Sequence, residues 1–379
     1  VSENADFRIR QEIENRPNAP LYKKFGLELT SIGGDALSRT EEAYASRWVD
    51  KLPTAAGGGL IRGSGRSYTA FLNRLRADSF DAMLSALARD GSNPTKEEGK
   101  AIANYINVAT GRGKVGKNEK SGEVLNTVFF APRLVASRFQ LLAGQPLYGG
   151  SNRTRKMIAM EYARFLIGVS VAIGLAMLMR DEDDETKPIE LDPRSANFGK
   201  VRFGDTFLDP LAGLAQVTVF LARVASGETR TTTKDELKPL RDAYRLTDIA
   251  PGLGDGYELG KTGYGGRDVP DVIASFLRSK LAPVPGAVIN VATGKNMIGE
   301  TVTPMSAAGE LVTPMSVGNL VDVMEAQGMA RGTAINLLGV LGMSVQYRKS
   351  DEEKAVEEEN GVAGAFGFGT ADRSTDEQP

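Results

Sequence analysis

Apolar residues recur three or four positions apart over most of this chain, which is the spacing of a helix that buries one face. Over residues 68–91 this spacing predicts an amphipathic helix, and Gly91 is typical of its C-terminal cap. Residues 92–94 (Ser-Asn-Pro) then predict a new N-cap followed by a proline at the first helical position. A second helix is therefore expected from Pro94 through Val108.

Two longer apolar segments follow. Residues 124–143 have their apolar side chains on one side, and Pro132 predicts either two short helices or one kinked helix there. Residues 157–179 form the longest apolar stretch, and their last 15 residues contain no charge. We expect this stretch to form one continuous helix, packed against a second apolar helix at 210–224 and shielded from water.

The rest of the chain adds little regular structure. A β-hairpin is expected at 198–208, where two short strand-like runs flank a Gly-Asp turn. Residues 1–66 are weakly periodic and end near three successive glycines, which predicts an extended arm with one or two short helices. Residues 349–379 are acidic and glycine-rich, as in a tail that lies on a partner or stays mobile. The predicted fold is mainly α: an irregular helical assembly over 67–348, with one small hairpin and many glycine-rich loops.

The chain contains neither histidine nor cysteine. This excludes catalysis by Ser-His-Asp or Cys-His groups, zinc or haem ligation through imidazole or thiolate, and disulfide bonds. No pair of carboxylates stands out as an acid and base couple either. We therefore expect no catalytic residue, no cofactor and no metal site within this chain.

Charge is balanced overall but not along the chain. Residues 1–180 contain 26 Lys and Arg against 17 Asp and Glu, a net charge of +9, whereas residues 181–379 contain 20 against 31, a net charge of −11. A basic half is typical of proteins that bind nucleic acid or anionic membranes, and it is also found on ordinary solvated surfaces. Both interpretations stay open at this point.

Three motifs have the wrong context for ligand binding. Residues 111–116 match G-x-G-x-x-G but follow a helix instead of a strand, so a mobile basic loop is expected. Residues 256–262 resemble a phosphate-binding loop but have Asp255 where its first glycine belongs. The five acids at 181–185 lack the spacing of a calcium loop and are expected to be a solvated flank.

The apolar helix at 157–179 has two interpretations. It is about as long as the roughly 20 residues of a bilayer span, although Glu161 and Arg164 are costly in lipid. Its flanks are basic before and acidic after, as in a span with a cytoplasmic N-terminal side. Burial in a protein assembly is the other interpretation, and the two are compatible. The residues of this membrane or packing helix are Phe165, Leu166, Ile167, Val169, Val171, Ile173, Leu175, Met177 and Leu178, and those of its basic flank are Arg153, Arg155 and Lys156.

A second set of residues is expected to make assembly contacts: Phe129, Phe130, Arg133 and Arg138. A guanidinium group pairs with a carboxylate through two hydrogen bonds and stacks on aromatic rings. No histidine or cysteine exists to act beside it as base or nucleophile. We expect the two arginines to make structural ion pairs or backbone-carbonyl contacts that join this helix to the hairpin or to a neighbouring subunit.

Five short blocks occur in a fixed order between about residues 65 and 348: 68–73 (YTAFLN), 126–140 (NTVFFAPRLVASRFQ), 198–205 (FGKVRFGD), 276–285 (FLRSKLAPVP) and 313–316 (TPMS). In this order they resemble the large polyvalent-protein-associated domains near the C-terminal ends of very large phage and prophage proteins. Similar modules occur in virion proteins of short-tailed phages, including ejection proteins that are stored in the capsid and released through the tail with the genome. Those chains are usually far longer than this one.

The resemblance implies a phage virion structural or ejection protein that assembles near the portal or tail and helps conduct genome DNA across the host envelope. Its expected partners are other copies of itself, other virion proteins, genome DNA and the host membrane. It is expected in the virion and, after ejection, in the host periplasm or inner membrane. The alternatives are a portal- or tail-associated subunit that stays in the particle, and a fragment of a peptidoglycan-degrading or polymerase-containing virion enzyme.

Overall fold

The computed structural model describes most of the chain up to residue 294 and a few positions beyond it. The described residues are 3–30, 58–89, 91–115, 129, 131–178, 187–203, 205–211, 213–231, 235–240, 269–281, 283–294, 302–303, 323–324, 328–329, 332–333, 335 and 344–347. The chain is mainly helical with small antiparallel sheets, which confirms the predicted fold class. Several predictions fall outside the described residues, namely those for Phe130, 181–185, 256–262 and 349–379.

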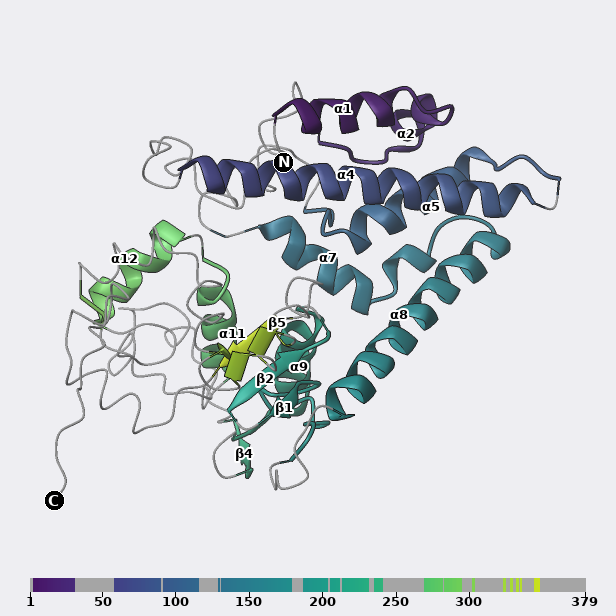
Figure 1. The fold of residues 1–379 in the computed structure, drawn as a ribbon. Helices are drawn as coiled ribbons and strands as arrows, with labels where there is room; N and C mark the ends of the chain where they lie inside the picture. Colours follow the sequence, from purple (N-terminus) through teal and green to yellow (C-terminus); the bar gives the residue numbers. More distant parts are fainter. Residues whose placement is uncertain are drawn as a thin grey trace, which may run out of the picture.

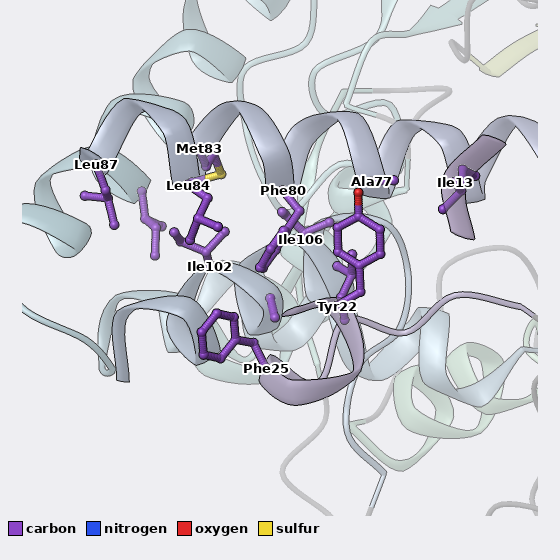
Figure 2. Packing of buried hydrophobic residues seen from close by; sticks show 13 residues of the cluster. Ile13, Tyr22, Phe25, Ala77, Phe80, Met83, Leu84, Leu87, Ile102 and Ile106 are labelled. Carbon is purple, nitrogen blue, oxygen red and sulfur yellow. The ribbon is translucent and has the colours of Figure 1, made fainter. Parts of the chain in front are cut away.

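The first two helices pack onto the longest helix of the chain (Figure 1). α1 (Glu3–Glu14) lies along α4 (Gly58–Ala88), and α2 (Ala19–Phe25) contacts α5 (Lys96–Ala109). The prediction of short helices is confirmed, but that of an extended arm is wrong for residues 3–30. Figure 2 shows why: these helices bury apolar side chains against α4 and α5, in a core that includes Ile13, Tyr22, Phe25, Phe80, Ile102 and Ile106.

Two helix boundaries differ from the sequence pattern. α4 begins at Gly58, well before the predicted start at residue 68, because glycines at 58, 59, 63 and 65 weaken both helix propensity and apolar periodicity. α5 begins after Thr95 instead of at Pro94. The hydroxyl of Thr95 accepts from the N–H of Glu98 at 3.3 Å, and the Glu98 carboxylate accepts from the N–H of Thr95 at 2.9 Å. This capping box fixes the start of the helix.

The next helices turn back across α5. α7 (Pro132–Leu142) has its proline in the first turn, so Pro132 begins this helix and does not kink it. A 3₁₀ turn, η3 (Gln145–Leu147), leads into α8 (Asn152–Leu178), which is continuous over 27 residues. The prediction of one unbroken apolar helix is therefore confirmed. α8 runs from the helical layer toward the sheet (Figure 1).

The predicted hairpin is present and forms part of a slightly larger sheet. β1 (Val201–Phe203) pairs with β2 (Thr206–Asp209), and β5 (Ser344–Tyr347) adds a third antiparallel strand on the other side of β2. A second small sheet, which the pattern did not indicate, consists of β3 (Glu228–Arg230) and β4 (Leu237–Pro239). The two sheets lie on the side of the molecule away from α1 (Figure 1).

Three more helices complete the described fold. α9 (Leu214–Ser226) matches the apolar helix expected at 210–224, and it is followed by α11 (Val269–Arg278) and α12 (Pro283–Thr293). Aromatic rings hold α7, α9 and α11 together. Phe220 stacks on Phe276 with ring centroids 4.3 Å apart, and Phe139 meets both rings edge-on at 6.1 and 6.0 Å. This cluster joins the helical layer to the sheet region.

Candidate functional site

The nine apolar residues assigned to the membrane or packing helix all lie on α8, and most of them are exposed. Ile167 is 63% exposed and Leu178 is 82% exposed, and only 6% of the most apolar 18-residue window is buried. The expected shielding is wrong, and α9 is not among the main contacts of α8. α8 mainly contacts α5 and η3 near its start and β1 near its end. Among the described residues, α8 alone is long and apolar enough to cross a membrane.

The N-terminal end of α8 is fixed by an ion pair. Glu98, in the first turn of α5, is 2% exposed, and Arg153 donates to it through Nε (2.7 Å) and Nη2 (2.9 Å). Arg153 also donates to the carbonyl of Leu87 at the end of α4 (3.3 Å), and the Ser151 hydroxyl donates to Glu98. Arg153 thus joins three helices and is not a solvated basic flank, whereas Arg155 and Lys156 are exposed.

Apolar contacts continue this attachment along the first three turns of α8. Thr154 and Ile158 are fully buried, and Tyr162 packs against the same core. The Tyr162 hydroxyl donates to the carbonyl of Leu141 on α7 at 3.1 Å. We call this contact region, from Arg153 to Tyr162, the N-terminal dock.

The C-terminal end of α8 lies against the three-stranded sheet. Ala176 is fully buried, and Ile173 packs with it against sheet residues Val201, Phe203 and Leu208. We call this contact region the C-terminal dock. Between the docks the helix is open, since a Cβ added at Gly168 would meet nothing within 4 Å. The centre of α8 is therefore an uncovered apolar surface.

The ion pair of the N-terminal dock predicts acid sensitivity. The Arg153 guanidinium holds the pKa of Glu98 well below its usual range, with further hydrogen bonds from Ser151 and the Thr95 backbone, although burial acts in the opposite direction. A depressed folded-state pKa means that this stabilisation is complete above the unfolded pKa of about 4.3 and is lost as the pH falls below it.

We expect the unfolding free energies of wild type and Glu98→Gln to differ most at about pH 7 and to converge progressively below about pH 4. Urea unfolding at a series of pH values measures this difference. A difference that stays constant down to about pH 3 would contradict the assignment.

Arg133 makes the kind of contact that was expected, but with a different partner. Its Nη2 donates to both Glu28 oxygens at 2.7 and 2.6 Å, and its Nε donates to the carbonyl of Gly113 at 3.0 Å. Arg112, which is buried, also donates to Glu28 at 3.2 Å and to Thr30 at 2.6 Å. The ion pair between Arg133 and Glu28 therefore joins α7 to the segment after α2, and not to the hairpin.

The loop after α5 is packed under α7, so the prediction of a mobile basic loop is wrong for residues 111–115. A Cβ added at Gly113 would lie 2.3 Å from the backbone nitrogen of Ser137 and 2.7 Å from the carbonyl oxygen of Arg133. Gly113→Ala is expected to lower the free energy of unfolding by about 2 to 3 kcal/mol, because the backbone must move.

The control for Gly113→Ala is Gly174→Ala, at an open position within α8. It is expected to raise the free energy of unfolding by about 0.5 to 1 kcal/mol, since alanine favours helix. Thermal and urea unfolding followed by circular dichroism measure both variants. Equal effects at the two sites would show that α7 does not pack on this loop as described.

Phe129 and Arg138, the other described residues expected to make assembly contacts, lie away from the ion pair between Arg133 and Glu28. Phe129 forms an antiparallel bridge with Leu281, which ties the segment before α7 to the end of α11. Arg138 makes neither an ion pair nor a carbonyl contact with the described residues. Its Nε would lie 3.9 Å from a Cβ on Gly213, at the turn before α9, and burial lowers the pKa of Arg138. The two arginines therefore do not converge on one site.

The geometry around α8 offers a surface for contact. No three acidic side chains of the described chain lie close enough to hold a metal ion. No protein-family model, curated protein or solved structure matches this chain. Function is therefore inferred from the residues themselves, and α8 with its two docks is the feature from which that inference starts.

Proposed function

We propose that this protein is a phage virion protein that assembles near the portal or tail and is released with the genome to help conduct DNA across the host envelope. α8 is the part that engages the host membrane. The exposure of this 27-residue apolar helix carries the proposal. Folded chains rarely leave so much contiguous apolar surface in water unless a membrane or another protein covers it.

Two features of the chain support passage through a narrow tail, and a third supports the resemblance to phage modules. The absence of cysteine means that no disulfide has to be broken before the chain unfolds or reassembles. The glycine content, 43 of 379 residues, suits a loop-rich fold. Two of the blocks that resemble phage modules also meet in space, because Phe139 and Phe276 belong to the same aromatic cluster.

A second candidate is a portal- or tail-associated subunit that never leaves the particle. The same observation favours it, since a neighbouring subunit would cover the apolar centre of α8 as effectively as lipid. The two candidates differ in where the protein is found after the genome has been released.

An antibody against the chain separates the two candidates. Particles of a phage that encodes this chain are triggered to release their DNA, and emptied and full particles are compared by quantitative immunoblotting. The proposal predicts that the protein is present in full particles and lost from emptied ones. Retention in emptied particles would favour the second candidate, and absence from both would contradict the proposal and the alternative together.

A further inference from the structure

We infer that α8 of the folded protein lies in the plane of an anionic membrane surface and does not span it. This inference rests on the proposed function, because it concerns the membrane contact of the same helix. It follows from three observations: the two docks, the pattern of side chains that α8 turns outward, and the charges among them.

The docks leave too little free helix for a span. Tyr162 is the last residue of the N-terminal dock and Ile173 is the first of the C-terminal dock, so only residues 163–172 lie between them. At about 1.5 Å per residue these ten residues measure about 15 Å, half of the roughly 30 Å hydrocarbon layer. A spanning helix would therefore have to leave at least one dock.

Both docks belong to a single body. The N-terminal dock includes α5 and α7, and the C-terminal dock is built on β1 and β2. α9, which follows β2 after four residues, packs on α7 through Phe220 and Phe139, whose rings meet edge to face at 6.1 Å. With both ends of α8 held on one body, the whole protein stays on one side of the bilayer, and the helix meets lipid with its flank.

The flank that faces outward is a continuous stripe. At about 100° per residue, its members fall within an arc of roughly 100°, whose centre lies about 150° from the buried positions Ile158 and Ala176. All of them are exposed. This outward stripe consists of Lys156, Met160, Arg164, Ile167, Val171, Leu175 and Leu178.

The order of side chains along the outward stripe identifies the partner as anionic lipid. Lys156 and Arg164 lie in its N-terminal half, and four aliphatic residues follow without a charge. The only acid of α8, Glu161, is paired with Arg164, so Lys156 and the neighbouring exposed Arg155 supply the net positive charge of this half. Cations at one end of an exposed apolar helix attract it to anionic headgroups, and the aliphatic side chains that follow gain from burial among the acyl chains.

The natural absence of cysteine allows depth to be measured at single sites. Met160→Cys, Ile167→Cys and Leu175→Cys are each labelled with an environment-sensitive fluorophore in the full chain. Each is then mixed with vesicles of phosphatidylglycerol and phosphatidylcholine that contain a quencher at a shallow or a deep acyl position. Val288→Cys on α12, which is also exposed, is the control that should not respond.

An in-plane helix predicts that all three labels are quenched similarly and more by the shallow quencher, with binding about tenfold weaker to phosphatidylcholine alone. A spanning helix predicts a different profile, in which the label at position 167 is quenched mainly by the deep quencher and the labels at 160 and 175 by the shallow one. That profile would overturn this inference and leave the proposed function standing.

Two further results would overturn the inference for other reasons. No response to vesicles at any of the three sites would contradict the membrane part of the proposed function as well. If the fluorophores become shielded from water without lipid, and more so as the protein concentration rises, a second copy of the chain is the partner of the outward stripe.

Discussion

Replacing Arg153 by alanine is expected to lower the free energy of unfolding by about 3 kcal/mol. The substitution leaves the Glu98 carboxylate, which is 2% exposed, without its charged partner. Losing one member of a buried ion pair typically costs about 3 to 5 kcal/mol, and the lower end applies because the Arg153 side chain is 30% exposed. Urea unfolding at neutral pH, followed by circular dichroism, gives the value.

Arg155→Ala is the matched control. It removes the same charge two residues away on the same helix, but from an exposed side chain. It is expected to change the free energy of unfolding by less than about 0.5 kcal/mol. If the two variants were equally stable, Arg153 would be a surface charge and the N-terminal dock would not exist as described.

The double substitution Ile167→Ser and Val171→Ser is expected to weaken binding to anionic vesicles about 100-fold. Each side chain contributes roughly 1.5 kcal/mol or more when it moves from water into lipid, and about 1.4 kcal/mol corresponds to a factor of ten. Both side chains are already exposed in the folded protein, so stability should change by less than about 1 kcal/mol. Vesicle flotation at a series of lipid concentrations measures the binding.

Val288→Ser with Val291→Ser controls for a general loss of surface hydrophobicity. Both valines are exposed on α12, which lies away from α8 (Figure 1). This pair should leave vesicle binding within about twofold of wild type, since residues outside the membrane contact contribute no lipid burial. A comparable loss in both double variants would show that the apolar face of α8 has no special role.

The positions of most helices could be predicted from periodicity, and those of the main hairpin from its turn. α8 and α9 were identified because uninterrupted apolar runs have few alternatives to helix. The strand β5 was not identified, because residues 344–347 pair with β2 from more than 130 positions away, and nothing local indicates such pairing. Prolines at 283 and 285 are typical of a helix end, yet Pro283 begins α12.

The environment of each element was harder to predict than its type. An apolar run such as 157–179 has the same sequence pattern whether protein, lipid or water surrounds it, so the exposure of Ile167 was not foreseen. The role of Arg153 was missed for a related reason. Its partner Glu98 lies 55 residues earlier, and the sequence marks that acid only as part of the first turn of a helix.

The central claim is that α8 places this protein on a membrane. Photolabelling of the full chain on anionic vesicles with a lipid-borne diazirine, followed by mass spectrometry, tests it most directly. The claim predicts that, among the described residues, label is concentrated on the outward stripe from Ile167 to Leu178 and is scarce on Val201, Phe203 and Phe80. Label spread evenly over exposed apolar residues such as Phe71 and Val288, or absent from α8, would contradict it.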